Sequence, residues 1–116
     1  MFIEQPPQFI RQLYPRACWR MNASERVVYL TFDDGPSNNT LLILNTLKKY
    51  NVKATFFVVN TAYLDDYIDD IYADGHAVGL HCNSHTWSQV YASEQAYYAD
   101  LQTIDDLIYK YIGLRT

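Results

Sequence analysis

Continuous apolar runs alternate with amphipathic stretches from residue 27 to the end of the chain. Three of the apolar runs are short, rich in β-branched and aromatic residues, and followed by turn-forming residues, which is typical of β-strands. Because they do not alternate between apolar and polar positions, they are typical of strands in a parallel sheet. The predicted strands are Val27–Phe32, Ala54–Asn60 and His76–Cys82.

The first predicted helix covers Thr40–Tyr50, where apolar residues recur with helical spacing. Asn38 or Asn39 is placed to cap its N-terminus, and Asn51 can adopt the left-handed conformation that ends a helix. The residues predicted to face the core are Leu41, Leu44 and Leu47.

Two further helices are predicted, one over residues 64–75 with Gly75 as its end, and one from about Ser93 to Tyr111 that Gly113 closes. Residues 83–91, between the third strand and the last helix, contain a predicted loop. The residues that the first of these helices should bury are Leu64, Tyr67, Ile68 and Ile71.

The alternation of strands and helices predicts an α/β fold in which right-handed crossovers join parallel strands that helices cover. Residues 1–26, which are punctuated by proline, are predicted to form an N-terminal arm lying over the domain. Residues 27–116 contain no linker or internal repeat and are predicted to form one domain.

Charge and composition exclude several function classes. The formal net charge is -4 and no Lys/Arg cluster occurs, so no nucleic-acid partner is expected. No apolar run approaches the roughly 20 residues of a membrane span, and the N-terminus lacks the features of a secretory signal. As written, the chain is expected in the cytoplasm, whereas a longer parent chain could act in the cell envelope or outside the cell.

The two cysteines, Cys18 and Cys82, are far apart in the sequence and form no CxxC motif. Two buried thiols are the simpler interpretation. A disulfide between them is the alternative that the sequence leaves open.

Candidate catalytic groups follow the first and third predicted strands. Asp33 and Asp34 end the first strand, while His81 ends the third and His85 lies four residues further on. Because ligands bind at the carboxyl ends of parallel strands, these groups are expected at one edge of the sheet. Two imidazoles and a carboxylate suit zinc or a similar divalent ion, and a second carboxylate beside the ion could act as general base.

The adjacent aspartates need an explanation, because two carboxylates this close repel each other. A divalent cation would reverse that repulsion and would also lower the pKa of a bound water towards about 7. Strand geometry would point the two side chains to opposite faces, so the Gly35-Pro36 turn is expected to redirect both towards the site.

Each motif also has a plain structural interpretation. The spacing of His81 and His85 recurs by chance on protein surfaces, and Asp-Asp-Gly-Pro is commonly a simple turn. His76 is interpreted as a structural residue where a strand begins. The eleven tyrosines are interpreted as packing between helices and sheet rather than as a sugar-binding surface.

Two segments, taken together, resemble a known family. "TFDDGP" at Thr31–Pro36 and "GHAVGLHCNSH" at Gly75–His85, in this order and separation, resemble the polysaccharide deacetylases, which are the NodB homology enzymes of carbohydrate esterase family 4. "KATFFVVN" is also similar to a connecting strand of that family. The resemblance runs from about Val27 to the C-terminus.

This resemblance implies a distorted (β/α) barrel that hydrolyses N-acetyl groups on an amino-sugar polymer or oligomer of the chitin or peptidoglycan type and releases acetate. An N-acetylated glycan is therefore the implied partner. Asp33 corresponds by position to the family's catalytic base. The residues that correspond to its metal ligands are Asp34, His81 and His85. The metal is commonly zinc, with cobalt or nickel in some members.

The chain departs from the family pattern in two ways. Cys82 stands where Ser or Thr is usual, adding a soft atom that zinc could bind adventitiously, and Asn83 replaces a frequent aromatic residue. The later Arg-x-Pro-Tyr, Asp-Trp and Leu-x-His motifs, which supply oxyanion donors and the general acid, do not occur before the chain stops at "YIGLRT". The expected fold is thus a parallel βαβαβα half of a NodB-like barrel.

Half a barrel would leave both sheet edges open. The chain is therefore expected either to form a homo-oligomer that closes these edges or to be a fragment of a longer protein. Alternatives to a deacetylase are a catalytically impaired metal-binding scaffold and a hydrolase of other acyl amides.

Overall fold

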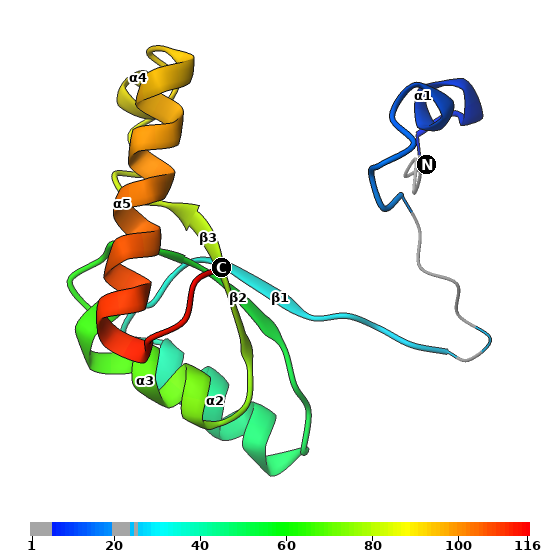
Figure 1. Ribbon diagram of the computed structural model, residues 1–116. Coiled ribbons are helices and arrows are strands. Elements are labelled where there is room, and N and C mark those ends of the chain that lie inside the picture. The colour runs from blue at the N-terminus through cyan, green and yellow to red at the C-terminus, as the bar shows by residue number, and fades with distance from the viewer. Residues whose placement is uncertain (1–5, 20–23, 25) are drawn as a thin grey trace.

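A parallel sheet of three strands, in the order β1-β2-β3, organises the chain (Figure 1). The structure is a computed structural model that describes residues 6–19, 24 and 26–116. The strands are β1 Thr31–Gly35, β2 Thr55–Val59 and β3 Ala77–Cys82. The helices are α1 Gln8–Leu13, α2 Thr40–Lys49, α3 Leu64–Ala73, α4 Trp87–Val90 and α5 Glu94–Ile112. The predicted α/β alternation is confirmed.

The strands run in the same direction, with Thr31 opposite Thr55 and Thr55 opposite Ala77. Helix α2 connects β1 to β2, and α3 connects β2 to β3. The carboxyl ends of all three strands therefore meet at one edge of the sheet, which is where the sequence placed the candidate catalytic groups.

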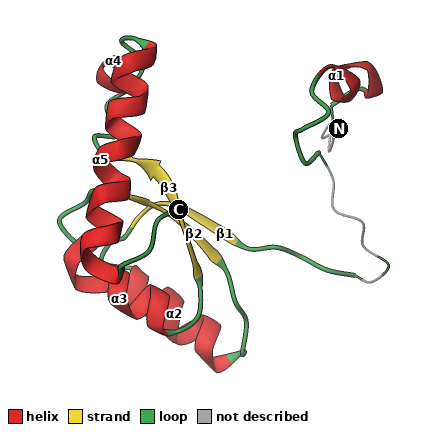
Figure 2. Cartoon of the chain, viewed as in Figure 1, coloured by secondary structure: helices red, strands yellow, loops and turns green. Residues whose placement is uncertain are grey.

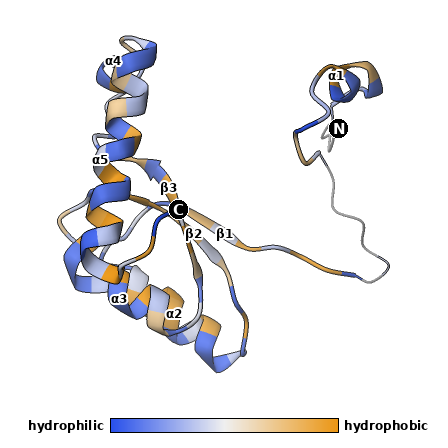
Figure 3. Cartoon of the chain, in the orientation of Figure 1, coloured by the Kyte–Doolittle hydropathy of each residue, from blue (hydrophilic) through white to orange (hydrophobic). Residues whose placement is uncertain are grey.

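One hydrophobic core fills the space between the sheet and helices α2, α3 and α5, which Figure 2 shows on the same side of the strands. Alternate residues of β2, Phe56 and Val58, point into this core. The helices contribute Leu44, Leu47, Leu64, Ile68, Ile71, Ile104 and Ile108. Figure 3 shows the same amphipathic pattern, with polar residues on the outer sides of the helices.

The opposite face of the sheet is not covered by any helix of the described chain. Its residues include Thr31, which is exposed, and Thr55, Phe57 and Gly79, which are half-buried. Phe57 lies across Gly79, since a Cβ built on Gly79 would be 2.7 Å from the Phe57 ring. The prediction that helices cover the sheet is therefore confirmed for the face that packs on α2, α3 and α5.

The first strand begins later than predicted. Residues 27–30 are exposed and lie outside any strand, and β1 starts at Thr31. The reason is that β2 begins only at Thr55, whose N–H donates to the Leu30 carbonyl oxygen at 3.0 Å, so the preceding residues have no strand to pair with.

Helix α2 is rotated relative to the predicted face. Leu44 and Leu47 are buried as expected, but Leu41 is 50% exposed and Thr40 is buried in its place. Neither asparagine side chain caps the helix; instead the Thr40 Oγ1 accepts a hydrogen bond from the Ser37 N–H at 2.9 Å. This bond draws Thr40 inward, and the helical period then places Leu41 outward.

The other helix ends follow the prediction. Asn51 and Gly113 both adopt the left-handed conformation, and the Ser93 hydroxyl accepts a hydrogen bond from the Ala96 N–H at 3.0 Å. In α3 the predicted inward residues Leu64, Ile68 and Ile71 are buried, and Tyr67 is half-buried. The short helix α4 lies where a loop was predicted.

Helix α1 buries none of its residues; that residues 1–26 lie over the domain as an arm stays a prediction. No disulfide joins Cys18 to Cys82: Cys18 is exposed and Cys82 is buried, so the prediction of two buried thiols is right only for Cys82. Among the described residues, no helix combines the length and the apolar character that a membrane span requires.

Candidate metal and catalytic site

Asp34 occupies a β-bulge near the end of β1. Asp33 lies opposite Phe57 and Gly35 lies opposite Val58, which leaves Asp34 as an extra residue between them. Its φ of 66° is in the left-handed region that non-glycine residues seldom adopt. Because a bulge interrupts the alternation of strand faces, Asp34 is redirected without moving its neighbours. The sequence analysis predicted that the aspartates are redirected towards the site, but it attributed this change to the Gly35-Pro36 turn that follows them.

His81 occupies a second irregularity, near the end of β3. Val58 of β2 pairs with Leu80 of β3, and the next residue, Val59, pairs with Cys82. His81 is therefore an extra residue in β3. His85 follows in the loop after β3 and also has a positive φ, of 49°. All three predicted metal ligands thus lie at departures from regular backbone geometry, as is common beside functional sites.

These three side chains converge on one point. The Nε2 atoms of His81 and His85 lie 2.7 Å and 3.0 Å from the same oxygen, Asp34 Oδ1. The centroids of the two imidazole rings are 5.5 Å apart. Each side chain keeps a third or more of its surface exposed, so ions in solution can reach the cluster.

Asp33 lies beside this cluster on an exposed position of β1. It shares with Asp34 the wall of a cavity of about 310 Å³ at the carboxyl end of the sheet. Phe57 from β2 and Thr40 from α2 also line this cavity. Asp33 is therefore close to the cluster but, among the described residues, only Asp34 of the two aspartates pairs with the histidines.

Cys82 offers a second set of ligand atoms. One atom each from His81, Cys82 and His85 lies within 4.8 Å of the others. The Cys82 side chain, however, is buried in a small apolar cluster on the helix side of β3. Burial raises the pKa of its thiol, an effect that a hydrogen bond from the His85 backbone partly offsets. Unlike Cys82, Asp34 has one oxygen within 3.0 Å of the Nε2 atoms of both histidines, so the geometry favours Asp34 as the third candidate ligand.

Asp100 of α5 holds the loop that carries His85. Its Oδ2 accepts a hydrogen bond from the Asn83 N–H at 2.6 Å, and its Oδ1 accepts one from the Ser84 N–H at 3.0 Å. The sequence interpretation missed Asp100. A signal was present, because Asp100 precedes the buried Ile104 by one helical turn and so places a carboxylate on the apolar face of α5.

Two residues after β2 connect the loops on either side of it. The Asn60 amide donates to the Asn83 side-chain oxygen at 2.9 Å, and the Thr61 hydroxyl donates to the Pro36 carbonyl oxygen at 2.7 Å. The loop after β1 and the loop after β3 are thus both tied to the end of the central strand.

His76, at the amino end of β3, is structural, as the sequence indicated. It is 5% exposed, its Nδ1 accepts a hydrogen bond from the Ala54 N–H at 3.2 Å, and its ring packs on Phe56. Burial, followed by the nearby Lys53, lowers the pKa of His76, which favours the neutral imidazole that can accept this bond.

The chain matches the family model described as polysaccharide deacetylase over residues 20–116. It is 38% identical over 113 residues to a peptidoglycan-N-acetylglucosamine deacetylase of Bacillus cereus, covering 95% of this chain and 40% of that protein.

Solved structures agree with this match. The catalytic domain of a peptidoglycan N-acetylglucosamine deacetylase from Eubacterium rectale superposes with a TM-score of 0.79 and 41% identity, covering 88% of this chain and 47% of that one. A family 4 acetyl xylan esterase from Clostridium thermocellum, solved in complex with a cobalt ion, superposes with a TM-score of 0.66 and 35% identity, covering 75% of this chain and 44% of that one. The chain thus spans less than half the length of these relatives.

Proposed function

Because this chain belongs to the polysaccharide deacetylase family, we propose that it carries the base and the metal ligands for hydrolysis of N-acetyl groups on an amino-sugar polymer or oligomer. N-acetylglucosamine of the chitin or peptidoglycan type is the proposed substrate, and acetate is the released product. The observation that carries this proposal is the convergence of His81 and His85 on a single Asp34 oxygen.

The donor set fits a divalent cation. Asp34, His81 and His85 would hold the ion through one carboxylate oxygen and two imidazole nitrogens, a combination that suits zinc best and cobalt or nickel as well. When bound, such an ion would polarise the acetamide carbonyl and make water more acidic. The charge of the ion would stabilise the exposed carboxylate of Asp34 and would offset the repulsion from the second carboxylate beside it.

Asp33 acts as the general base in this proposal. Its carboxylate accepts a proton from the water that adds to the acetamide carbonyl carbon. The C–N bond then breaks, the amine nitrogen gains a proton, and acetate leaves. Within these 116 residues we assign no donor for that last proton, since the family motif that corresponds to the general acid is not among them.

Measurements of acetate release and zinc affinity test the proposal. With N-acetylglucosamine oligomers as substrate, release should require zinc and should fall by at least about 100-fold in Asp33→Asn, in which zinc affinity is kept. Asp34→Asn should lose zinc affinity, and Cys82→Ser should retain it. Full acetate release by Asp33→Asn, or loss of zinc from Cys82→Ser alone, would refute these assignments.

A second function is favoured by the uncovered face of the sheet. In this alternative the chain binds metal but turns over poorly, and acts as a fragment or a self-assembling scaffold whose copies close the open edges of the sheet. Zinc binding without acetate release, in an oligomer of defined size by light scattering, would support it. A folded monomer that releases acetate would exclude it.

A further inference from the structure

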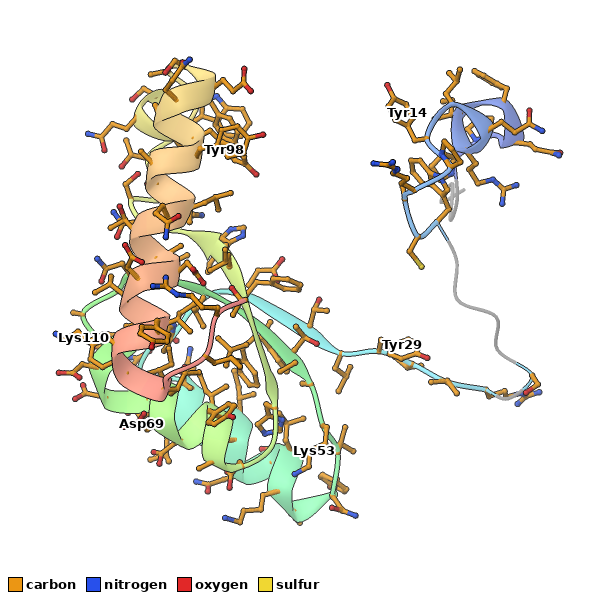
Figure 4. The ribbon with its side chains drawn as sticks, in the orientation of Figure 1. Tyr14, Tyr29, Lys53, Asp69, Tyr98 and Lys110 are labelled. Atoms are coloured by element: carbon orange, nitrogen blue, oxygen red, sulfur yellow. The ribbon has the colours of Figure 1, made fainter. Side chains whose placement is uncertain are left out.

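Four aromatic residues form a continuous cluster from α4 to the start of α5. The ring centroids of Trp87 and Tyr91 are 4.5 Å apart, those of Tyr91 and Tyr97 are 5.9 Å apart, and those of Tyr97 and Tyr98 are 5.6 Å apart. Tyr98 marks this end of α5 in Figure 4. The sequence interpretation assigned the tyrosines to packing, and this holds for Tyr97, which packs on a buried cluster that contains Val90.

Packing in the protein core does not account for Trp87 and Tyr91, because both side chains are exposed. Trp87 is 78% exposed and Tyr91 is 57% exposed. Large exposed aromatic side chains that lie next to one another are characteristic of binding surfaces rather than of inert protein surface. Since Tyr91 is in contact with the half-buried Tyr97, its ring is held from behind and requires little ordering when a ligand binds.

The aromatic pair shares one cavity with His81 and His85, two of the three proposed metal ligands. It has a volume of about 370 Å³ and is lined by His81, Cys82, His85, Trp87, Val90 and Tyr91. This volume is within the range of small-molecule sites. The lining contains no Asp, Glu, Lys or Arg, and neither do residues 86–93. The cavity is thus suited to a neutral, polar ligand with an apolar face.

We propose that Trp87 and Tyr91 form a saccharide subsite that binds the sugar ring next to the one being deacetylated. This inference rests on the proposed function, because it takes a glycan as the ligand. A pyranose ring presents a face of C–H groups, which packs on the electron-rich face of an aromatic ring, while its hydroxyl groups remain in water. The subsite would position the acetyl-bearing sugar over the Asp34 cluster by binding its neighbour.

Intrinsic fluorescence provides a direct test, because the chain has two tryptophans and Trp19→Phe leaves Trp87 as the only one. In this background, titration with the tetramer of N-acetylglucosamine should change the Trp87 emission in a saturable way. Adding Tyr91→Ala removes one aromatic contact and should therefore raise the dissociation constant of the tetramer about tenfold or more. Tyr72→Ala, an exposed position on α3 outside the cavity, is the matched control.

Calorimetry completes the test, because it can measure tetramer binding to Trp87→Ala, in which the fluorescent reporter has been removed. That variant should bind the tetramer at least about tenfold more weakly while its zinc affinity and unfolding temperature stay unchanged. An emission that never responds to the tetramer, or that changes with protein concentration alone because a second copy covers the pair, would overturn the subsite. So would equal tetramer affinity in Trp87→Ala.

Acetate release, measured on the same variants, separates this inference from the proposed function. Zinc-dependent release with unchanged tetramer binding in Trp87→Ala contradicts the subsite alone. Tetramer binding that depends on Trp87, without any acetate release, supports the subsite and contradicts the catalytic proposal.

Discussion

Replacing Asp100 with alanine should weaken metal binding, although Asp100 is not itself a proposed metal ligand. The Asp100 carboxylate accepts hydrogen bonds from two successive backbone N–H groups, at 2.6 Å and 3.0 Å, in the loop that leads to His85. Hydrogen bonds to a charged acceptor contribute about 1.5–3 kcal/mol each. Because water can replace part of each bond, we expect a total cost of about 2–4 kcal/mol, divided between overall stability and the order of the loop.

The effect on zinc follows from the geometry of that loop. His85 has a positive φ, and its Nε2 reaches Asp34 only while the loop keeps its shape. Outer contacts that orient metal ligands typically change metal affinity by about 10- to 100-fold, and we expect a loss in this range for Asp100→Ala. Asp100→Asn retains one acceptor oxygen and should fall between the alanine variant and the wild type.

Competition with a chromophoric zinc chelator would give the affinities, and thermal unfolding of the same samples would give the stability. Asp69→Ala is a suitable control, because Asp69 is exposed on α3, far from the loop (Figure 4). If Asp100→Ala lowered the unfolding temperature but bound zinc as tightly as the wild type, Asp100 would support the fold and not the site.

Two further predictions concern stability. His76 is buried as the neutral base with a lowered pKa, so its contribution to the free energy of unfolding should be constant above the ordinary histidine pKa of about 6.5 and should fall below it by at most about 1.4 kcal/mol per pH unit. Urea unfolding at pH 7.5 and 5.5 should show a smaller fall in His76→Gln than in the wild type, and an equal fall in both proteins would contradict this role. Gly79→Ala should lower the free energy of unfolding by about 1–3 kcal/mol, because its Cβ would meet the Phe57 ring at 2.7 Å. Thermal unfolding should show a smaller loss when Phe57→Ala is also present, and equal losses in the two backgrounds would contradict this contact.

The order of the elements and the edge of the sheet that holds the candidate site could both be predicted from the sequence alone. Apolar runs and helical spacing are local signals, so all three strands, α2, α3 and α5 could be predicted within a few residues. The carboxyl ends of parallel strands must share an edge, and this rule alone places Asp33 and Asp34 near His81 and His85. His76 was separated from this group for the same reason, since it begins a strand instead of ending one.

How these residues meet depends on contacts that form only in the folded chain. The bulges at Asp34 and His81 exist because the neighbouring strand advances by one residue where the bulged strand advances by two, and no property of either segment alone reports that pairing. The hydrogen bonds from the loop to Asp100 likewise join residues 16 and 17 positions apart in the sequence. The cavity at Trp87 forms where residues of α4 lie beside the end of β3. Each of these features depends on contacts between separate elements, which a pattern along the chain does not encode locally.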